Sequence, residues 1–560
     1  MSGVPVIIVF RINKAGMEKM KKNNKGKLNN KKQVLIIIAV ISIMVFICIV
    51  LQAYIEGYFG GKKKSVKTQT QNTINREKDG SNADSNDNKS SKTKNTKTVK
   101  KNNTAKNKRK KHKKRRVEHI AAHPESSKSI RVLITNSNFS DMFHKKIKLT
   151  SSSSFYVKVN NKTKSYAAGK KAVFNASDKK LKGKKIVVGS YNGAKIKVLN
   201  IKRQNIHPEY RGTMTIKYKS KGLLLTNTLP IEQYLYAVLP SEMSTSNPME
   251  ALKTQAVCAR SYAYNQMKSG KYAEYGADVD DSVACQVYNN ISEDKRSRKA
   301  VDGTFERVMK KSGKVVTAYY FSTSWGYTAD GQDVWNTPSK ISYLDSRFQI
   351  TARSRRKTGI KGYNLSNEQI FRNFINNESC TTYDSKEEWY RWSVKIKEKS
   401  LRSRIDSALS SSYVSNNANV LTKLKNGKYK SRSGFVTGKI KSIEITKREK
   451  SGMASEIIIR GNKNTYKVCN QYNIRKVLAP VSETIKRRYG TDMAGYFMLP
   501  SAAFYIDAVS GGFKITGGGF GHGTGMSQSG AGNMAKQGFN YRQILNHYFS
   551  GVKVTALKGY

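Results

Sequence analysis

Residues 229–262 read LPIEQYLYAVLPSEMSTSNPMEALKTQAVCARSY, a stretch that combines two predicted helices with one prominent acid. Apolar residues at helical spacing predict the helices near 231–238 and 248–268. The connection between them carries Glu242 on irregular backbone just before the second helix. A scaffold can hold a side chain rigidly at such a position and still leave it open to a ligand.

The second helix has a well-marked start in the sequence. Asn247 is a suitable N-cap, Pro248 is predicted at the first helical position, and Glu250 completes a variant capping box. Glu242 is therefore expected in the connection 240–247, ahead of a helix that is fixed at its start. Partial loss of water around such a carboxyl group raises its pKa toward the range that a general acid needs. The alternative is an exposed or capping glutamate without a chemical role.

A glycine loop forms the second notable stretch, since residues 517–531 read GGGFGHGTGMSQSGA. Its spacing matches neither the phosphate-binding G-x-x-x-x-G-K-S/T loop nor the G-x-G-x-x-G dinucleotide fingerprint. So many glycines permit unusual backbone angles and the close approach of a ligand. The imidazole of His522 could donate a hydrogen bond there or orient a carboxylate. Simple packing of a glycine-flanked turn is the alternative.

The remaining pattern predicts an α+β fold. Segments that alternate apolar and polar residues begin at Ser129 and are separated by Gly, Asn and Ser turns, which is typical of strands. Strand patterns return at 440–470 after the helices. Strands and helices do not alternate regularly, so we expect mixed sheets with helices around them in one domain, residues 128–560. Residues 346–430, basic and Ser-rich, are expected to be a less typical inserted section.

The charge of the chain is extreme, because 103 basic and 38 acidic residues among 560 give a formal net charge of +65. Such a charge predicts a polyanionic partner without identifying it, since nucleic acid, anionic lipid and an acidic cell wall would all serve. Residues 56–127, rich in Lys, Asn and Ser, contain too little apolar surface to fold and are expected to be a disordered linker.

Residues 33–55 are predicted to be a transmembrane signal anchor. The apolar run from Val34 to Leu51 extends to about 20 residues, or ~30 Å as a helix, which is enough to cross a bilayer. A cleaved signal peptide has a shorter apolar core, and a buried core helix is the other alternative. The Lys-rich tail 1–32 favours an internal N-terminus, which places residues 128–560 outside the cytoplasm. Beside such an anchor, the basic linker is expected to attract anionic wall polymer or lipid rather than nucleic acid.

Both quoted stretches resemble motifs of the stage II sporulation protein D and amidase-enhancer (SpoIID/LytB) family of bacterial cell-wall proteins. The PSEM segment followed by EALKTQAVCARSYAY is similar to the family's core motif, and FGHGTGMSQSGA is similar to its C-terminal signature. Two further segments support the resemblance, SWGYTADGQDVW at 324–335 and MLPSAAFYI at 498–506. The resemblance covers most of 129–560 and is weakest across 346–430.

The resemblance implies a lytic transglycosylase of peptidoglycan that acts in sporulation and engulfment. Such an enzyme cleaves the MurNAc–GlcNAc β-1,4 bond without water and leaves a 1,6-anhydro end. By position Glu242 would be the catalytic acid/base, and one carboxyl group can serve both proton transfers, which suits a chain without an obvious paired carboxylate motif. The substrate-binding residues would be Arg260, Tyr262, His522 and Gln528. Arg260 could instead be a packed structural arginine.

The partners expected are peptidoglycan glycan strands and, by family analogy, a cell-wall amidase, with no specific nucleic acid. Four aromatic residues could stack on sugars or equally belong to the core: Tyr262, Tyr288, Trp325 and Tyr327. The main alternative function is a non-catalytic protein that binds glycan and enhances an amidase. A nucleic-acid-binding protein is a more distant alternative, with an affinity that would fall steeply with salt.

No metal or other cofactor is expected. Zinc-bearing members of the family place His and Cys ligands just before a CQVY segment, where this chain offers only Cys285. The nearby Asp278, Asp280 and Asp281 are hard oxygen ligands that suit zinc less well. Beyond the predicted anchor the cysteines permit two disulfides or free buried thiols, and they are Cys258, Cys285, Cys380 and Cys469.

Overall fold

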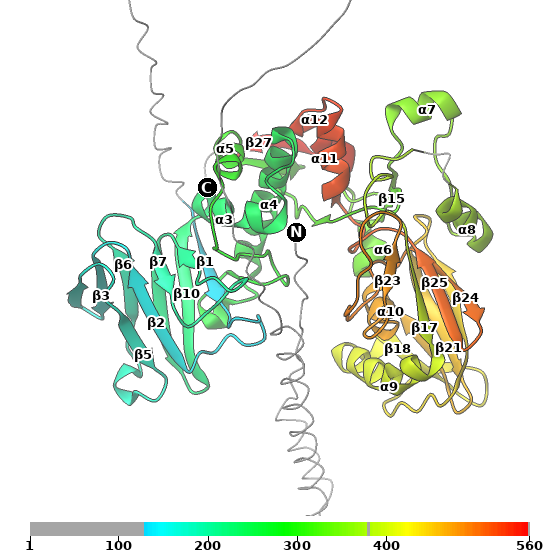
Figure 1. Cartoon of the computed structure of the whole chain (residues 1–560), viewed down its shortest axis with the longest axis horizontal. Coiled ribbons are helices and arrows are strands. Elements are labelled where there is room, and N and C mark those ends of the chain that lie inside the picture. Colours follow the sequence, from blue (N-terminus) through cyan, green and yellow to red (C-terminus); the bar gives the residue numbers. More distant parts are fainter. Residues whose placement is uncertain (1–127, 378–380, 558–560) are drawn as a thin grey trace, which may run out of the picture. The chain divides into compact units, whose positions relative to one another are not determined.

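The computed structural model describes residues 128–377 and 381–557. Their fold is α+β, as the sequence predicts, with several separate sheets and helices packed against them (Figure 1). None of the helices in these two ranges is long and apolar enough to cross a membrane. The predicted tail 1–32, anchor 33–55 and linker 56–127 lie outside the described residues.

Two sheets form the N-terminal part and share one hydrophobic core. The first has seven strands in the order β11-β1-β10-β9-β6-β3-β4, and the second has four in the order β5-β2-β7-β8. Alternation along β2 turns Ile147 and Leu149 into this core, together with Val157 and Ile216 of the larger sheet. The strands are β1 (Ser129–Ile134), β2 (Lys146–Ser151), β3 (Phe155–Val159), β4 (Lys162–Tyr166), β5 (Ala172–Asn175), β6 (Ile186–Ser190), β7 (Ile196–Val198), β8 (Glu209–Tyr210), β9 (Thr213–Lys219), β10 (Gly222–Pro230) and β11 (Val279–Asp280).

Helices α3 (Ile231–Glu242), α4 (Met249–Ser269) and α5 (Lys295–Asp302) pack on one another beside β1 and β10. The two helices predicted from 229–262 are thus present, but α3 is longer than expected and includes Glu242 as its last residue. The predicted capping of α4 is wrong, because Pro248 occupies the N-cap position and no side chain caps it. Glu250 instead accepts hydrogen bonds from Lys253 and from the backbone of Tyr541, which ties α4 to a distant helix.

Helices α11 (Gln528–Lys536) and α12 (Tyr541–Tyr548) pack against α4 from the C-terminal end of the chain. The parallel pair β14 (Tyr320–Phe321) and β26 (Met526–Ser527) leads directly into α11. The other elements here are β12 (Arg307–Lys311), β13 (Lys314–Val315), β15 (Tyr327–Thr328), α6 (Gly331–Trp335), β16 (Arg347–Phe348) and β27 (Lys553–Ala556). Short 3-10 helices lie at Lys179–Leu181, Ala273–Tyr275 and Asn417–Asn419.

Two antiparallel sheets form the C-terminal part, in the orders β19-β18-β22-β21-β20 and β23-β17-β25-β24. Residues 346–430 contribute β17 and β18, which pair with strands later in the chain, so this section is built into the same sheets and core. The elements are α7 (Ala352–Thr358), α8 (Glu368–Asn376), β17 (Trp392–Lys397), α9 (Glu398–Ser415), β18 (Val420–Lys423), β19 (Tyr429–Ser431), β20 (Ile440–Arg448), β21 (Ala454–Gly461), β22 (Thr465–Cys469), α10 (Gln471–Val477), β23 (Ile485–Arg487), β24 (Phe504–Val509) and β25 (Gly512–Gly517).

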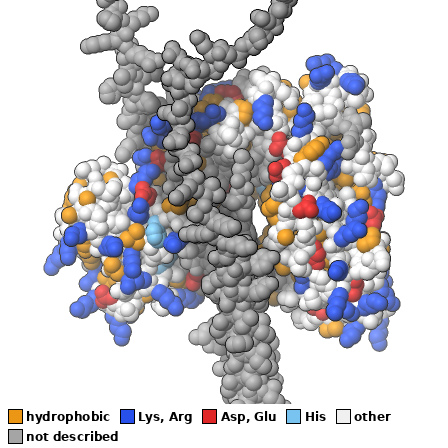
Figure 2. Space-filling view, viewed as in Figure 1, with side chains coloured by type: hydrophobic (Ala, Val, Ile, Leu, Met, Phe, Trp, Pro, Cys, Tyr) orange, Lys and Arg blue, Asp and Glu red, His pale blue; other side chains and the backbone are white. Residues whose placement is uncertain are grey.

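The surface carries the excess of basic residues that the sequence predicts. Lys and Arg side chains are spread over the face in view, and Asp and Glu side chains are fewer (Figure 2). Three of the buried acids among the described residues pair with arginine: Asp281 with Arg203 at 2.6 Å, Glu232 with Arg260 at 2.6 Å, and Asp278 with Arg131 at 2.6 Å. Buried charges without such partners would strongly destabilise the fold.

Candidate active site

Glu242 ends α3 with a half-buried carboxyl group that is held by two donors. Its Oε1 accepts a hydrogen bond of 2.6 Å from the backbone N–H of Val287, and the hydroxyl of Tyr320 donates a second. Gln286 in turn donates to the Tyr320 oxygen at 3.1 Å, which leaves the Tyr320 proton directed to Glu242. Burial raises the pKa of Glu242 to about 7, against the lowering effect of these two bonds. Near neutral pH this group can therefore both give and take a proton.

A polar pocket of about 250 Å³ opens beside Glu242. One face of α11 forms a wall of this pocket, and the loop that follows Glu242 forms another. Its lining consists of hydroxyl, amide and charged side chains almost throughout, which suits a ligand rich in hydroxyl and amide groups. The lining residues are Glu242, Met243, Ser244, Asn247, Ser322, Glu387, Gln528, Ser529, Gly532, Asn533 and Lys536.

Gln528 is the predicted site residue that the structure brings to Glu242. Its Nε2 donates to the backbone carbonyl of Glu242 at 3.0 Å and lies 3.4 Å from the Oε1 of Gln255. This bond joins the stretch 229–262 to the glycine-rich stretch 517–531, and its two residues are 286 positions apart in the sequence. Gln528 lines the pocket and fixes the end of α3 against the start of α11.

Asp384 anchors α11 and was not found from the sequence. Its Oδ1 accepts hydrogen bonds from the backbone N–H of Ser324 at 3.0 Å and from the hydroxyl of Ser527 at 2.5 Å, and its Oδ2 accepts one from the Ser324 hydroxyl at 2.7 Å. Ser527 is the N-cap of α11 and also accepts the N–H of Gly530. Burial raises the pKa of Asp384 to about 6, although the bonds from Ser527 and Ser324 oppose this.

His522 lies on the other side of β14 from Glu242. The ring centroids of Tyr319 and Phe321 lie 6.2 and 5.6 Å from that of the imidazole. Tyr320, between them in the sequence, points the other way and donates to Glu242, because successive side chains of an extended segment alternate in direction. Burial and the nearby charge of Arg475 lower the pKa of His522 to about 4, so the ring is neutral at neutral pH. His522 does not line the pocket beside Glu242, and its contact with substrate stays a prediction.

Arg260 is a structural residue, the alternative that the sequence left open. Its side chain is 0% exposed, and its Nε and Nη2 donate to the two carboxylate oxygens of Glu232 at 2.7 and 2.6 Å. Its Nη1 donates to the backbone carbonyl of Arg307 at 3.0 Å. These contacts join three elements, and they correct the expectation that Arg260 binds glycan directly.

The aromatic candidates lie in the interior or away from the pocket. Tyr288, Trp325 and Tyr327 are buried in the core, which favours the structural alternative for all three. Tyr262 is half-buried and packs the edge of its ring on Tyr319 at 6.0 Å. Near His522 the aromatic side chain of Trp335 is 37% exposed, and its ring centroid lies 5.2 Å from that of the imidazole.

The acids near 278–285 have structural partners. Asp278 pairs with Arg131, Asp281 with Arg203, and Asp280 accepts from Tyr272 and Ser282. Within the described ranges, no group of three or more His, Cys, Asp or Glu side chains is placed to hold a metal ion. The cysteines in these ranges are free thiols, namely Cys258, Cys285 and Cys469, and Cys380 lies outside them.

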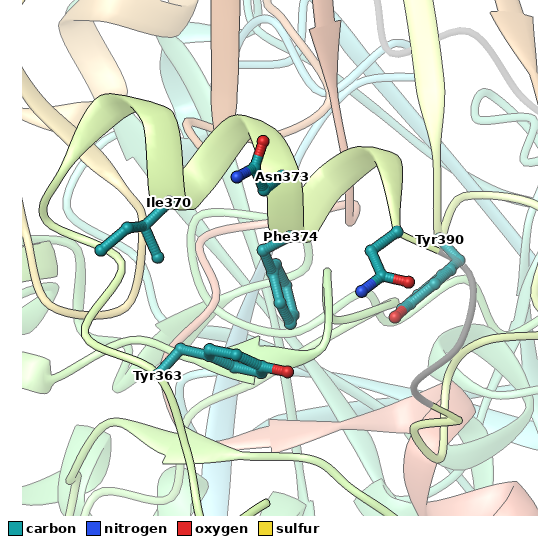
Figure 3. A pocket seen from close by; sticks show the side chains of 6 residues that line it. Tyr363, Ile370, Asn373, Phe374 and Tyr390 are labelled. Atoms are coloured by element: carbon teal, nitrogen blue, oxygen red, sulfur yellow. The ribbon is translucent and has the colours of Figure 1, made fainter.

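A second, more apolar pocket of about 170 Å³ lies beside α8. Figure 3 shows Ile370, Asn373 and Phe374 projecting from this helix, with Tyr363 and Tyr390 on either side of Phe374. Asn377 completes the lining. The lining offers no carboxyl, imidazole or thiol group, so the acid–base chemistry of a catalytic site is better supported at Glu242.

Comparison with known families agrees with this geometry. Residues 219–310, which include Glu242, match the model of a family described as Stage II sporulation protein (SpoIID). Residues 329–525 match a domain of unknown function, DUF8618. The chain thus contains a stage II sporulation protein domain, which confirms the resemblance to the stage II sporulation protein D and amidase-enhancer (SpoIID/LytB) family.

Three curated relatives show how far the similarity extends. An uncharacterised protein of Brachyspira hyodysenteriae is 29% identical over 350 residues, which are 62% of this chain and 72% of the relative. Stage II sporulation protein D of Bacillus subtilis is 24% identical over 372 residues, 62% of this chain and 83% of the relative. The amidase enhancer of Bacillus subtilis is 26% identical over 329 residues, 58% of this chain but 40% of the relative.

Proposed function

We propose that this protein is a peptidoglycan lytic transglycosylase that cleaves MurNAc-β-1,4-GlcNAc bonds of glycan strands and leaves 1,6-anhydro-MurNAc ends. The observation that carries the proposal is the state of Glu242, whose pKa of about 7 suits a group that acts first as an acid and then as a base. The polar pocket beside it suits a saccharide. Similarity to a family with sporulation proteins supports a role in sporulation and engulfment.

In the first step, protonated Glu242 gives its proton to the glycosidic oxygen. The bond between that oxygen and C1 of MurNAc breaks, and positive charge develops at C1. The carboxylate of Glu242 then takes the proton of the MurNAc 6-hydroxyl as its oxygen bonds to C1. No water is consumed, and Glu242 returns to its protonated form. The Val287 N–H and the Tyr320 hydroxyl hold the carboxyl group in one orientation through both transfers.

The main alternative is a non-catalytic protein that binds the cell wall and enhances an amidase. The name of one relative, amidase enhancer, favours it, although that match covers 40% of the relative. In this alternative the same pocket would bind glycan without cleaving it. A cell-wall amidase is the partner that we propose in either case.

Turnover that depends on Glu242 separates the two functions. The full chain and Glu242→Gln are incubated with purified cell wall, and both soluble fragments and wall-bound protein are measured. Gln keeps the volume of the side chain and an acceptor for the Val287 N–H, but it cannot donate and recover an acidic proton. We expect fragment release to fall at least ~1000-fold while wall binding stays within about threefold. Equal release by both proteins would exclude Glu242 as the acid, and binding without release by either would favour the amidase enhancer.

We also propose that residues 33–55 anchor the chain in the cell membrane, with tail 1–32 inside and residues 128–560 outside. The apolar run and the Lys-rich tail support this arrangement. The basic linker 56–127 would then lie next to the anionic wall. Protease added to cells whose wall has been removed should digest the 128–560 part while the membrane is intact. Its full protection would contradict the proposed orientation.

A further inference from the structure

The pocket beside Glu242 contains a second carboxyl group, that of Glu387. Glu387 lies outside the range that matches the sporulation domain and inside the range that matches the domain of unknown function. We propose that Glu387 binds donor groups of the glycan, a hydroxyl or an acetamido N–H, and so determines which sugar is presented to Glu242. This inference rests on the proposed function in taking a glycan as the ligand.

The carboxylate of Glu387 is fixed on one side only. Its Oε1 accepts a hydrogen bond of 2.6 Å from Nδ2 of Asn533, a residue of α11, and the same Nδ2 donates to the carbonyl of Tyr383 at 2.9 Å. The described residues provide no further hydrogen bond or ion pair to this carboxylate, which leaves Oε2 available to a ligand. A half-buried carboxylate in a polar pocket gains a charge-assisted bond when such a ligand supplies a donor.

The backbone around Glu387 is rigidly attached to α11. The N–H of Glu387 donates to the carbonyl of Asp384 at 2.9 Å, and the N–H of Tyr390 donates to the carbonyl of Glu387 at 3.0 Å. The buried side chain of Asp384 holds Ser527 at the start of α11. A carboxyl group on such a support keeps its position relative to Glu242, as a substrate-binding residue must.

The helix α11 contacts both acids of the pocket. Gln528 bonds the backbone of Glu242, and Asn533 bonds the side chain of Glu387. These two residues are five positions apart, or about 7.5 Å along the helix axis. Glu242 and Glu387 line the same pocket of about 250 Å³. A sugar whose glycosidic oxygen lies at Glu242 can therefore place a donor of the same or the next ring at Glu387.

Neutral donors of the glycan fit this position better than other ligands. The groups around Glu387 are mostly uncharged hydroxyl and amide side chains, including Ser322, Ser529 and Asn533, which match the alternating hydroxyl and acetamido groups of peptidoglycan sugars. The neighbouring Glu388 provides a matched control. It carries the same charge one residue away, but it pairs with Arg487 and does not line the pocket.

The first test compares the kinetics of the full chain with those of Glu387→Gln and Glu388→Gln on peptide-stripped glycan strands. Gln at 387 keeps an oxygen that can accept the Asn533 bond and removes the charge. We expect the KM of Glu387→Gln to rise about 10- to 100-fold with kcat within about threefold, the same anhydro product, and an unchanged Tm. Glu388→Gln should match the wild type. A fall in kcat without a rise in KM would overturn the binding role.

A second test measures binding without cleavage, so that it remains valid if the proposed reaction is wrong. Calorimetry with a neutral β-1,4-linked N-acetylglucosamine hexamer is performed on the full chain carrying Glu242→Gln. Adding Glu387→Gln should weaken this binding about tenfold or more, and adding Glu388→Gln should not. Equal affinity in all three proteins would overturn the inference even if the wild type cleaves glycan. If only the protein with the added Glu387→Gln loses affinity and the wild type does not cleave glycan, Glu387 is supported as a glycan ligand and the transglycosylase is excluded.

Discussion

At the residue scale, the central feature is a carboxyl group that the fold keeps partly protonated near neutral pH. Glu242 combines burial, which raises its pKa to about 7, with donors from Val287 and Tyr320, which keep the charged form accessible. A fully buried carboxyl group without these donors would stay protonated near neutral pH, and a fully exposed one would stay ionised. The balance suits a reaction in which one group must serve in both forms.

The raised pKa of Glu242 lowers the unfolding free energy at neutral and alkaline pH. The pKa of Glu242 is raised from its ordinary value of 4.5 to about 7, so the folded state holds its proton more tightly than the unfolded state. The unfolding free energy therefore falls as pH rises from about 4.5 to 7, and changes no further above that. Glu242→Gln lacks this ionisation. We expect its stability relative to the wild type to increase by roughly 1–3 kcal/mol between pH 4 and pH 8.

Denaturant unfolding of both proteins at several pH values measures this difference. The sign follows from proton binding alone, since between pH 4.5 and 7 the native state binds more protons at this site than the unfolded chain does. A difference between the two proteins that is the same at pH 4 and pH 8 would mean that the carboxyl group of Glu242 is not desolvated as described.

At the element scale, the site depends on how α11 is attached. A Cβ at Gly530 would collide with the hydroxyl of Tyr548 and lie 2.9 Å from Asp384 Oδ2, so glycine permits the close approach of this helix. Asp384 then fixes Ser527 at its start, and the helix presents Gln528 and Asn533 to the two acids of the pocket. The helix is thus the common support of Glu242 and Glu387.

Removing the Asp384 anchor should therefore affect both stability and activity. Asp384→Ala leaves the buried hydroxyls of Ser324 and Ser527 without their acceptor, which should lower the unfolding free energy by roughly 2–4 kcal/mol. We also expect activity per folded molecule to fall, because α11 loses its fixed start. Unfolding curves and fragment release from cell wall measure the two effects.

Asp406→Ala is the matched control for that change. Asp406 of α9 accepts hydrogen bonds from the N–H and the hydroxyl of Thr437 at 2.9 and 2.6 Å, and it does not line the pocket. Its loss should reduce stability and leave activity per folded molecule intact. If Asp384→Ala behaved in the same way as Asp406→Ala, the anchor would have no role in shaping the site.

Local sequence patterns predicted the helices of the site, but they did not predict the contacts between those helices. The helical spacing of apolar residues located α3 and α4, although the capping predicted for α4 is wrong. The end of α3 was missed because a proline at position 240 suggests a break, whereas here the helix continues past it. The family resemblance assigned Arg260 to the substrate. Sequence alone does not indicate that it meets Glu232, 28 residues away, in a buried ion pair.

At the scale of the whole molecule, the pocket is assembled from distant parts of the chain. Glu242 comes from the range that matches the sporulation domain, Glu387 from the range that matches the domain of unknown function, and Gln528 from beyond both. Family motifs identified the first and the last of these residues. Asp384 and Glu387 lie in 346–430, where the resemblance is weakest, so neither motif nor periodicity marked them. Only the fold places Glu387 in the pocket of Glu242 and Asp384 at the start of α11.

The most direct test of the central claim is the mass of the new ends that the full chain produces from peptide-stripped glycan strands, with Glu242→Gln alongside. The account predicts 1,6-anhydro-MurNAc ends from the wild type, each lighter by one water than an ordinary reducing end, and none from the variant. Reducing ends from the wild type, or anhydro ends that persist in Glu242→Gln, would contradict a water-free cleavage carried out by this single acid.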